Sequence, residues 1–180
     1  MAVDMKQLIA ETLAGLLERK SVDKITVKEL VETCGISRQA FYYHFQDIMD
    51  VIEWTAAQAL HKAVDLSLAA STPQEALETL ILFLRKDRKL IQHLMGSQRR
   101  AEIERLLVQS ARAYLSAMIR AKAAGLSASP QDLETAIHFY SYGLVGMMME
   151  TLDEERDAAV LSKQFYGLVT GSLWDGPEAS

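Results

Sequence analysis

A short segment near the N-terminus concentrates side chains that can hydrogen-bond to nucleic acid. It is the run RQAFYYH, whose polar members are Arg38, Gln39, Tyr42, Tyr43 and His44. Arginine can pair with guanine and glutamine with adenine, whereas tyrosine and histidine can reach phosphate oxygens. We interpret Arg38, Gln39 and Tyr42 as candidates for reading bases. Such a cluster suits a DNA major groove better than an ordinary solvated surface.

The residues before this segment predict that it is the second helix of a helix-turn-helix. Thr26 can cap a first helix, and Glu29 follows it at the spacing of a capping box. Gly35 can adopt the left-handed conformation that a sharp turn after a helix requires, and Ser37 can cap the second helix. Two short helices joined by a glycine-containing turn form this motif. The alternative is a plain helical hairpin with a solvated aromatic edge.

The stretch from Met5 to Trp54 resembles the DNA-binding domain of TetR/AcrR-type transcriptional regulators. The residues that carry the resemblance are ITVKELVETCGIS, RQAFYYHF and QDIMDVIEW. The form FYYHF-x-DI-x-D-x-IEW is also similar to a narrower group, the regulators of the dihydroxyacetone-kinase type. Many TetR-type proteins carry a phosphate-holding lysine where this chain has Ile48, which cannot make that contact. Members of the narrower group tolerate an apolar residue there.

The resemblance implies roles for further residues of the N-terminal region. Tyr43 and His44 would bind phosphates of double-stranded DNA. Secondary contacts would come from Thr26, Lys28 and Ser37.

Two segments near the C-terminus, residues 131–152 and 157–174, are apolar and rich in small residues. Gly143 and Gly146 lie in the first segment, and Gly167 and Gly171 lie in the second. Glycine lowers helix stability, so its repetition needs a reason such as the close approach of two helices. In TetR-like proteins the last two helices form a four-helix bundle with a second subunit, and the resemblance therefore implies a homodimer through these segments. Packing within one chain is the alternative.

The composition limits the class of protein. With 180 residues and a 49% apolar fraction, the chain can form one or two small folded domains. Its single cysteine excludes an internal disulfide and a cysteine-based metal site. The N-terminus shows no apolar segment after a basic start, and no run approaches the length of a membrane span. A cytoplasmic location without membrane association is therefore expected.

The charge of the chain argues against strong non-specific binding to DNA. The formal net charge is −5, and residues 1–54 carry six Lys and Arg against nine Asp and Glu, a net of −3. Specific binding can still rely on a few donors and on helix N-termini. The sequence therefore predicts modest DNA affinity with marked salt dependence.

Helical periodicity continues along the whole chain and predicts an all-α fold of about nine helices. The first helix is expected over Met5 to Lys20, and a long helix is expected over Ile48 to Ala70. Residues 1–46 would form the helix-turn-helix DNA-binding domain, and residues 47–180 would form an effector-binding and dimerisation domain.

The sequence contains no pattern typical of catalysis. Its four histidines are scattered and neither HExxH nor CxxC occurs, so neither an enzyme nor a metal or cofactor site is expected. An effector pocket in the C-terminal region is expected instead, because methionine adapts to varied apolar ligands and tyrosine and histidine supply polar anchors. Each candidate can equally be part of the core. The candidates are Trp54, Leu84, His93, Met95, Tyr114, Met118, His138, Tyr142, Met147 and Met148.

These features together predict a transcriptional repressor that acts as a homodimer on a palindromic operator. Its two recognition helices would enter successive major grooves about 34–36 Å apart. An effector that binds better to another spacing would draw the dimer off the DNA. One alternative is an activator or repressor controlled by a partner protein instead of a small molecule. Another is a helical adaptor or enzyme that keeps the hairpin only for packing.

Overall fold

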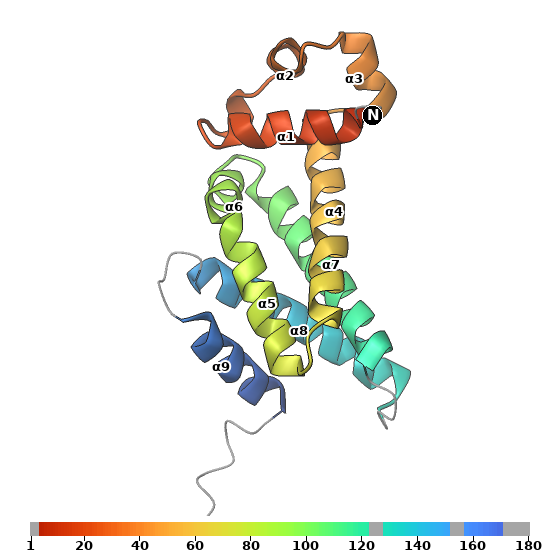
Figure 1. The fold of residues 1–180 in the computed structure, drawn as a ribbon, viewed down its shortest axis with the longest axis vertical. Coiled ribbons are helices and arrows are strands. Elements are labelled where there is room, and N and C mark those ends of the chain that lie inside the picture. The colour runs from red at the N-terminus through yellow and green to blue at the C-terminus, as the bar shows by residue number, and fades with distance from the viewer. Residues whose placement is uncertain (1–3, 123–127, 152–156, 171–180) are drawn as a thin grey trace, which may run out of the picture. The chain divides into compact units, whose positions relative to one another are not determined.

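The computed structural model describes residues 4–122, 128–151 and 157–170, and the regular structure in these ranges is helical throughout. The prediction of an all-α fold is confirmed (Figure 1). The chain begins with α1 (Met5–Leu17), the 3-10 turn η1 (Val22–Lys24), α2 (Val27–Cys34), α3 (Arg38–His44) and α4 (Ile48–Leu68). It continues with α5 (Pro73–Lys86), α6 (Arg88–Met95), α7 (Arg100–Lys122), α8 (Pro130–Thr151) and α9 (Ala158–Thr170).

The chain folds into two compact units. The first contains the residues up to Ala59 together with Lys89–Leu106, and the second contains Leu60–Arg88 and the residues from Leu107 onward. Both α4 and α7 therefore contribute residues to each unit within one continuous helix. The functional boundary expected between residues 46 and 47 stays a prediction, because compactness alone does not define a DNA-binding domain.

The first unit is built on the three helices α1, α2 and α3, which pack around one apolar core. Each helix buries the residues that recur at helical spacing on one of its faces. Helix α1 contacts both α2 and α3, which lie above it in Figure 1. This packing fixes the orientation of α3 on the other two helices. The buried side chains are Leu13, Leu17, Leu30, Val31, Phe41 and Phe45.

The first helix is shorter than the sequence predicts, because it ends at Leu17 and not at Lys20. The residues that follow form η1, whose N-cap Ser21 accepts a hydrogen bond from the backbone N–H of Asp23. Val22 is buried, whereas a continued helix would turn its side chain about 140° from that of Leu17, away from the buried face of α1. The ammonium of Lys20 instead pairs with the carboxylate of Glu29 on α2.

The second unit buries a polar link in its core. The Tyr114 hydroxyl on α7 donates to Ser67 Oγ on α4 over 2.8 Å, and Ser67 Oγ donates to the Ala76 carbonyl on α5 over 3.3 Å. Ala63 and Leu80 surround Tyr114. Burial raises the pKa of the Tyr114 phenol above its ordinary value, and the hydrogen bond with Ser67 partly opposes that rise. This link holds three helices together at one point.

Candidate nucleic-acid interface

The turn between α2 and α3 has the geometry that its glycine predicts. Gly35 adopts φ 70° and ψ 29°, the left-handed conformation. The Ile36 N–H donates to the Val31 carbonyl over 3.0 Å, which closes the end of α2. A Cβ placed on Gly35 would meet no atom within 4 Å, so the demand for glycine comes from the backbone alone.

Helix α3 is fixed at both ends and along one face. Ser37 Oγ accepts a hydrogen bond from the Ala40 N–H over 3.0 Å and caps the helix. The rings of Phe41 and Phe45 are buried with their centroids 6.1 Å apart. Because both aromatic anchors point into the core, the remaining faces of α3 must face outward. A helix held in this way can present side chains without reordering its backbone.

The five polar residues predicted on α3 lie largely on its outer surface. Tyr43 is 85% exposed and Tyr42 is 57% exposed. Arg38 and Gln39 are also exposed, whereas His44 is half-buried. The rings of Tyr43 and His44 meet edge to face at 5.0 Å. The structure thus brings together the candidates that the sequence singles out, and it leaves the roles assigned to them as predictions.

The secondary candidates already have local partners. Thr26 Oγ1 accepts from the Glu29 N–H over 3.2 Å and caps α2. The Lys28 ammonium lies 3.9 Å from Glu32 one turn later, a surface pair that salt screens easily. A capping hydroxyl accepts one hydrogen bond and keeps its own hydrogen for donation. Thr26 and Ser37 can therefore cap their helices and still donate to a phosphate.

The capping box expected at α2 is only half formed. Thr26 caps the helix as predicted, but the Glu29 carboxylate reaches Lys20 in the segment after α1 and does not return to the Thr26 backbone. The partner comes from a segment nine residues away, which spacing within α2 cannot indicate.

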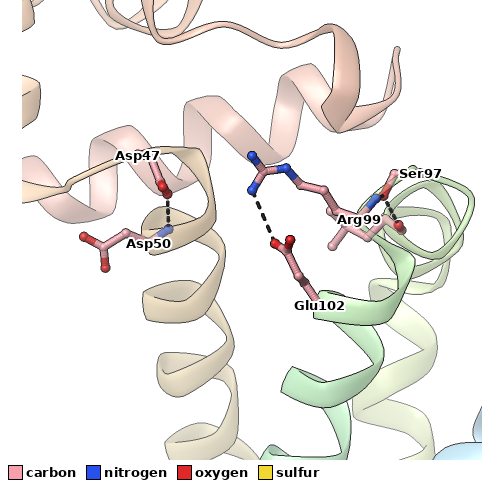
Figure 2. A network of polar contacts seen from close by, with 6 residues as sticks. Asp47, Asp50, Ser97, Arg99 and Glu102 are labelled. Atoms are coloured by element: carbon pink, nitrogen blue, oxygen red, sulfur yellow. Dashed lines mark hydrogen bonds and ion pairs between the residues drawn. The ribbon is translucent and has the colours of Figure 1, made fainter.

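Two carboxylates at the start of α4 accept hydrogen bonds from nearby backbone N–H groups. Asp47 Oδ1 accepts from the Asp50 N–H over 3.0 Å, as Figure 2 shows. Asp50 Oδ2 accepts from the Gln46 N–H over 2.9 Å. Asp47 thereby caps α4. Asp50 accepts from the residue before this cap, four positions back, so the pair is not a capping box, and this contact was not predicted from the sequence. The carboxylates make this helix start acidic.

The predicted effector-pocket residues are divided between the two units. Trp54 packs edge-on against Phe45 at 6.0 Å, and His93 Nδ1 lies 2.6 Å from the Leu17 carbonyl. Both contacts belong to the first unit. His138 and Tyr142 stack on each other at 5.2 Å and are both exposed on α8.

The remaining pocket candidates belong to the second unit. Tyr114 and Met118 pack into its core, and Met147 is half-buried on α8. A small apolar cleft lies elsewhere in this unit, between α5, α8 and α9. Two of the predicted pocket residues, Leu84 and Met148, line this cleft. Their spacing in the sequence does not distinguish them from ordinary core residues. The full lining is Leu77, Leu80, Ile81, Leu84, Arg85, Leu144, Met148, Leu161 and Phe165.

The described ranges contain neither a metal site nor a membrane-spanning helix. Among the described residues, no three His, Cys, Asp or Glu side chains gather in a way that could hold a metal ion. None of the helices in these ranges is both long and apolar enough to span a bilayer.

Comparison with known proteins gives matches over both parts of the chain. Residues 9–53 match the model of bacterial regulatory proteins of the tetR family, and residues 71–171 match the model of a transcriptional regulator C-terminal region. The HTH-type transcriptional regulator AcrR of Shigella flexneri is 24% identical over 110 residues, which are 60% of this chain and 48% of AcrR. YerO of Bacillus subtilis strain 168 is 29% identical over 84 residues, 43% of this chain and 29% of YerO. The chain therefore aligns with less than half the length of either relative.

A solved structure shows the same fold over nearly the whole chain. The dihydroxyacetone kinase operon activator DhaS has a TM-score of 0.71 and covers 96% of this chain and 98% of its own, at 16% identity. At that identity the likeness concerns the fold.

Proposed function

Because the chain belongs to the TetR family of bacterial transcriptional regulators, we propose that it represses transcription as a homodimer on a palindromic operator. Membership makes it a DNA-binding transcription factor and not an enzyme. The observation that carries the proposal is the outer face of α3, where two exposed tyrosines accompany exposed Arg38 and Gln39. Arg38, Gln39 and Tyr42 would read bases, and Tyr43 and His44 would bind phosphates.

An unpartnered face of α8 supports dimerisation. Phe139 is 73% exposed and Tyr142 is 56% exposed, and they share one helix face with Gly143 and Gly146 at helical spacing. A Cβ on either glycine would meet no atom within 4 Å. Packing within one chain therefore does not explain the glycines, although each lowers helix stability by about 1 kcal/mol relative to alanine. A second copy whose aromatic rings lie over these glycines would explain both features.

Helix α9 extends this apolar surface. Val160, Leu168 and Val169 are exposed on it, and the Tyr140 hydroxyl on α8 donates to the Val169 carbonyl over 3.4 Å. We therefore place the dimer interface on residues 131–152 and 157–174. Residue 152 and residues 171–174 of these segments, Gly171 among them, lie outside the described residues.

The apolar cleft between α5, α8 and α9 is the effector site that we favour. Eight of its nine lining residues are apolar, so it suits an apolar ligand. The cleft shares α8 and α9 with the proposed dimer interface, which would let a bound ligand change the spacing of the two subunits. Control by a partner protein remains the alternative. It would be favoured if a protein co-purifies with the chain and small apolar ligands have no effect on DNA binding.

The spacing of the operator tests the dimer proposal. DNase footprinting on the DNA upstream of the gene would identify the palindrome. Five inserted base pairs would then rotate one half-site by about half a helical turn, away from the second recognition helix. We expect specific binding to fall toward that of a single half-site. Equal affinity for the two spacings would contradict a rigid dimer on two major grooves.

A further inference from the structure

Lys6 is the cation that the structure places beside the end of the recognition helix. Its Nζ lies 5.3 Å from the centroid of the Phe45 ring, and Phe45 directly follows Tyr43 and His44 in the chain. Figure 1 shows the N-terminal end of α1 next to the C-terminal end of α3. The ammonium therefore lies at the end of α3 that carries the two proposed phosphate ligands.

The neighbouring helix start is unfavourable for an anion because two carboxylates lie there. A free helix N-terminus attracts phosphate through its N–H groups, but at α4 the Asp50 N–H already donates to Asp47 and the Gln46 N–H to Asp50. Two carboxylates at this position would repel a phosphate. Ile48, the first residue of α4, brings no charge. The chain thus requires another cation if a phosphate is to be bound near this end of α3.

Three other cations of the first unit pair with carboxylates. Lys20 pairs with Glu29, and Lys28 pairs with Glu32 over 3.9 Å. Arg99 Nη1 lies 3.4 Å from Glu102, as drawn in Figure 2. Lys6 differs from these because its ammonium lies over an aromatic ring. A ring does not neutralise the charge of the ammonium, which can still donate to phosphate oxygens.

We propose that Lys6 binds a DNA backbone phosphate beside the major groove that α3 enters. The assignment rests on the proposed function, because it requires that α3 bind DNA. The lysine stem is half-buried, and its position over Phe45 holds the ammonium in place before DNA arrives. Less side-chain entropy is then lost on binding than for a lysine that moves freely in solvent. Lys6 thereby replaces a contact that the acidic start of α4 cannot make.

The test is the salt dependence of operator binding by full-length protein. Lys6→Met removes the charge and keeps an apolar stem against Phe45, and Lys6→Arg restores a cation. Lys62→Gln is the control, because it removes one charge from an exposed position in the second unit. Fluorescence anisotropy at several salt concentrations gives the slope of log K against log salt. Thermal unfolding of each variant reports its folding separately.

Each phosphate contact contributes about −0.9 to the slope, so Lys6→Met, which removes one contact per subunit, should make the slope of a dimer less negative by about 1.8. Lys6→Arg and Lys62→Gln should keep the wild-type slope. Specific wild-type binding with the same slope in Lys6→Met would overturn the assignment to Lys6 and leave the proposed function standing. Wild-type protein without specific binding would overturn both. A changed thermal midpoint with an unchanged slope would show that Lys6 is only structural.

Discussion

Substitution of Gly35 by alanine tests whether the turn between α2 and α3 depends on backbone conformation alone. The residue lies at φ 70°, where an L side chain costs about 1–2 kcal/mol. A Cβ there meets no atom within 4 Å, so no steric overlap adds to this cost. We therefore expect Gly35→Ala to lower the free energy of unfolding by about 1–2 kcal/mol, which for a chain of this size lowers Tm by roughly 2–8 °C.

Gly15 in α1 supplies a matched control. A Cβ at Gly15 also meets no atom within 4 Å, and its φ is not in the left-handed region. Gly15→Ala should therefore stabilise the helix by about 1 kcal/mol, the difference in helix propensity between the two residues. The same glycine-to-alanine change should therefore lower the free energy of unfolding at Gly35 and raise it at Gly15.

Thermal unfolding by circular dichroism at one protein concentration measures both variants. Concentration must be fixed because dimerisation adds to apparent stability. The stability of Gly35→Asn should lie between those of wild type and Gly35→Ala, because asparagine adopts the left-handed conformation more easily than alanine does. A Gly35→Ala protein as stable as Gly15→Ala would refute the reasoning, since it would mean that the turn tolerates a side chain without strain.

Three further predictions concern the interface, the dimer and the core. Arg38→Ala should lose about 1–3 kcal/mol of operator affinity and discriminate less at one base pair. Tyr43→Phe should weaken binding to all DNA sequences alike. Fluorescence anisotropy on operators mutated one position at a time separates these results. Phe139→Glu should convert the dimer to a monomer, as measured by light scattering. The control Leu82→Glu, at an exposed position of α5, should leave the dimer intact. A dimeric Phe139→Glu protein would place the interface elsewhere. The pKa of Tyr114 is raised in the folded state, so the phenol keeps its proton to higher pH there than in the unfolded chain. The resulting stability is fully present below the unfolded pKa of about 10. It is lost as the pH rises through the folded pKa. Wild-type protein should therefore lose stability above pH 10 more steeply than Tyr114→Phe in urea unfolding, and parallel curves would contradict this assignment.

Local signals along the chain predict the N-terminal unit well. Thr26, Ser37 and Asp47 each cap the helix start that their position indicates, and Gly35 adopts the expected left-handed conformation. Such features depend on residues only a few positions apart. The same is true of the burial of Phe41 and Phe45 on one face of α3.

Contacts between distant segments were not predictable in the same way. The end of α1 at Leu17 depends on the burial of Val22 and on the pairing of Lys20 with α2. The position of Lys6 over Phe45 joins residues 39 positions apart in the sequence. The apolar cleft likewise depends on how α5, α8 and α9 pack. Periodicity shows which face of a helix is apolar, but it does not show which helix covers that face.

The central claim is that the outer face of α3 binds DNA of a particular sequence. The most direct measurement is fluorescence anisotropy of wild-type protein and of Arg38→Ala on the DNA upstream of the gene, with a scrambled duplex of equal length, at two salt concentrations. The account predicts specific binding by wild type that weakens with salt, and a loss of specificity in Arg38→Ala. Equal binding of wild type to both duplexes at low salt would contradict it.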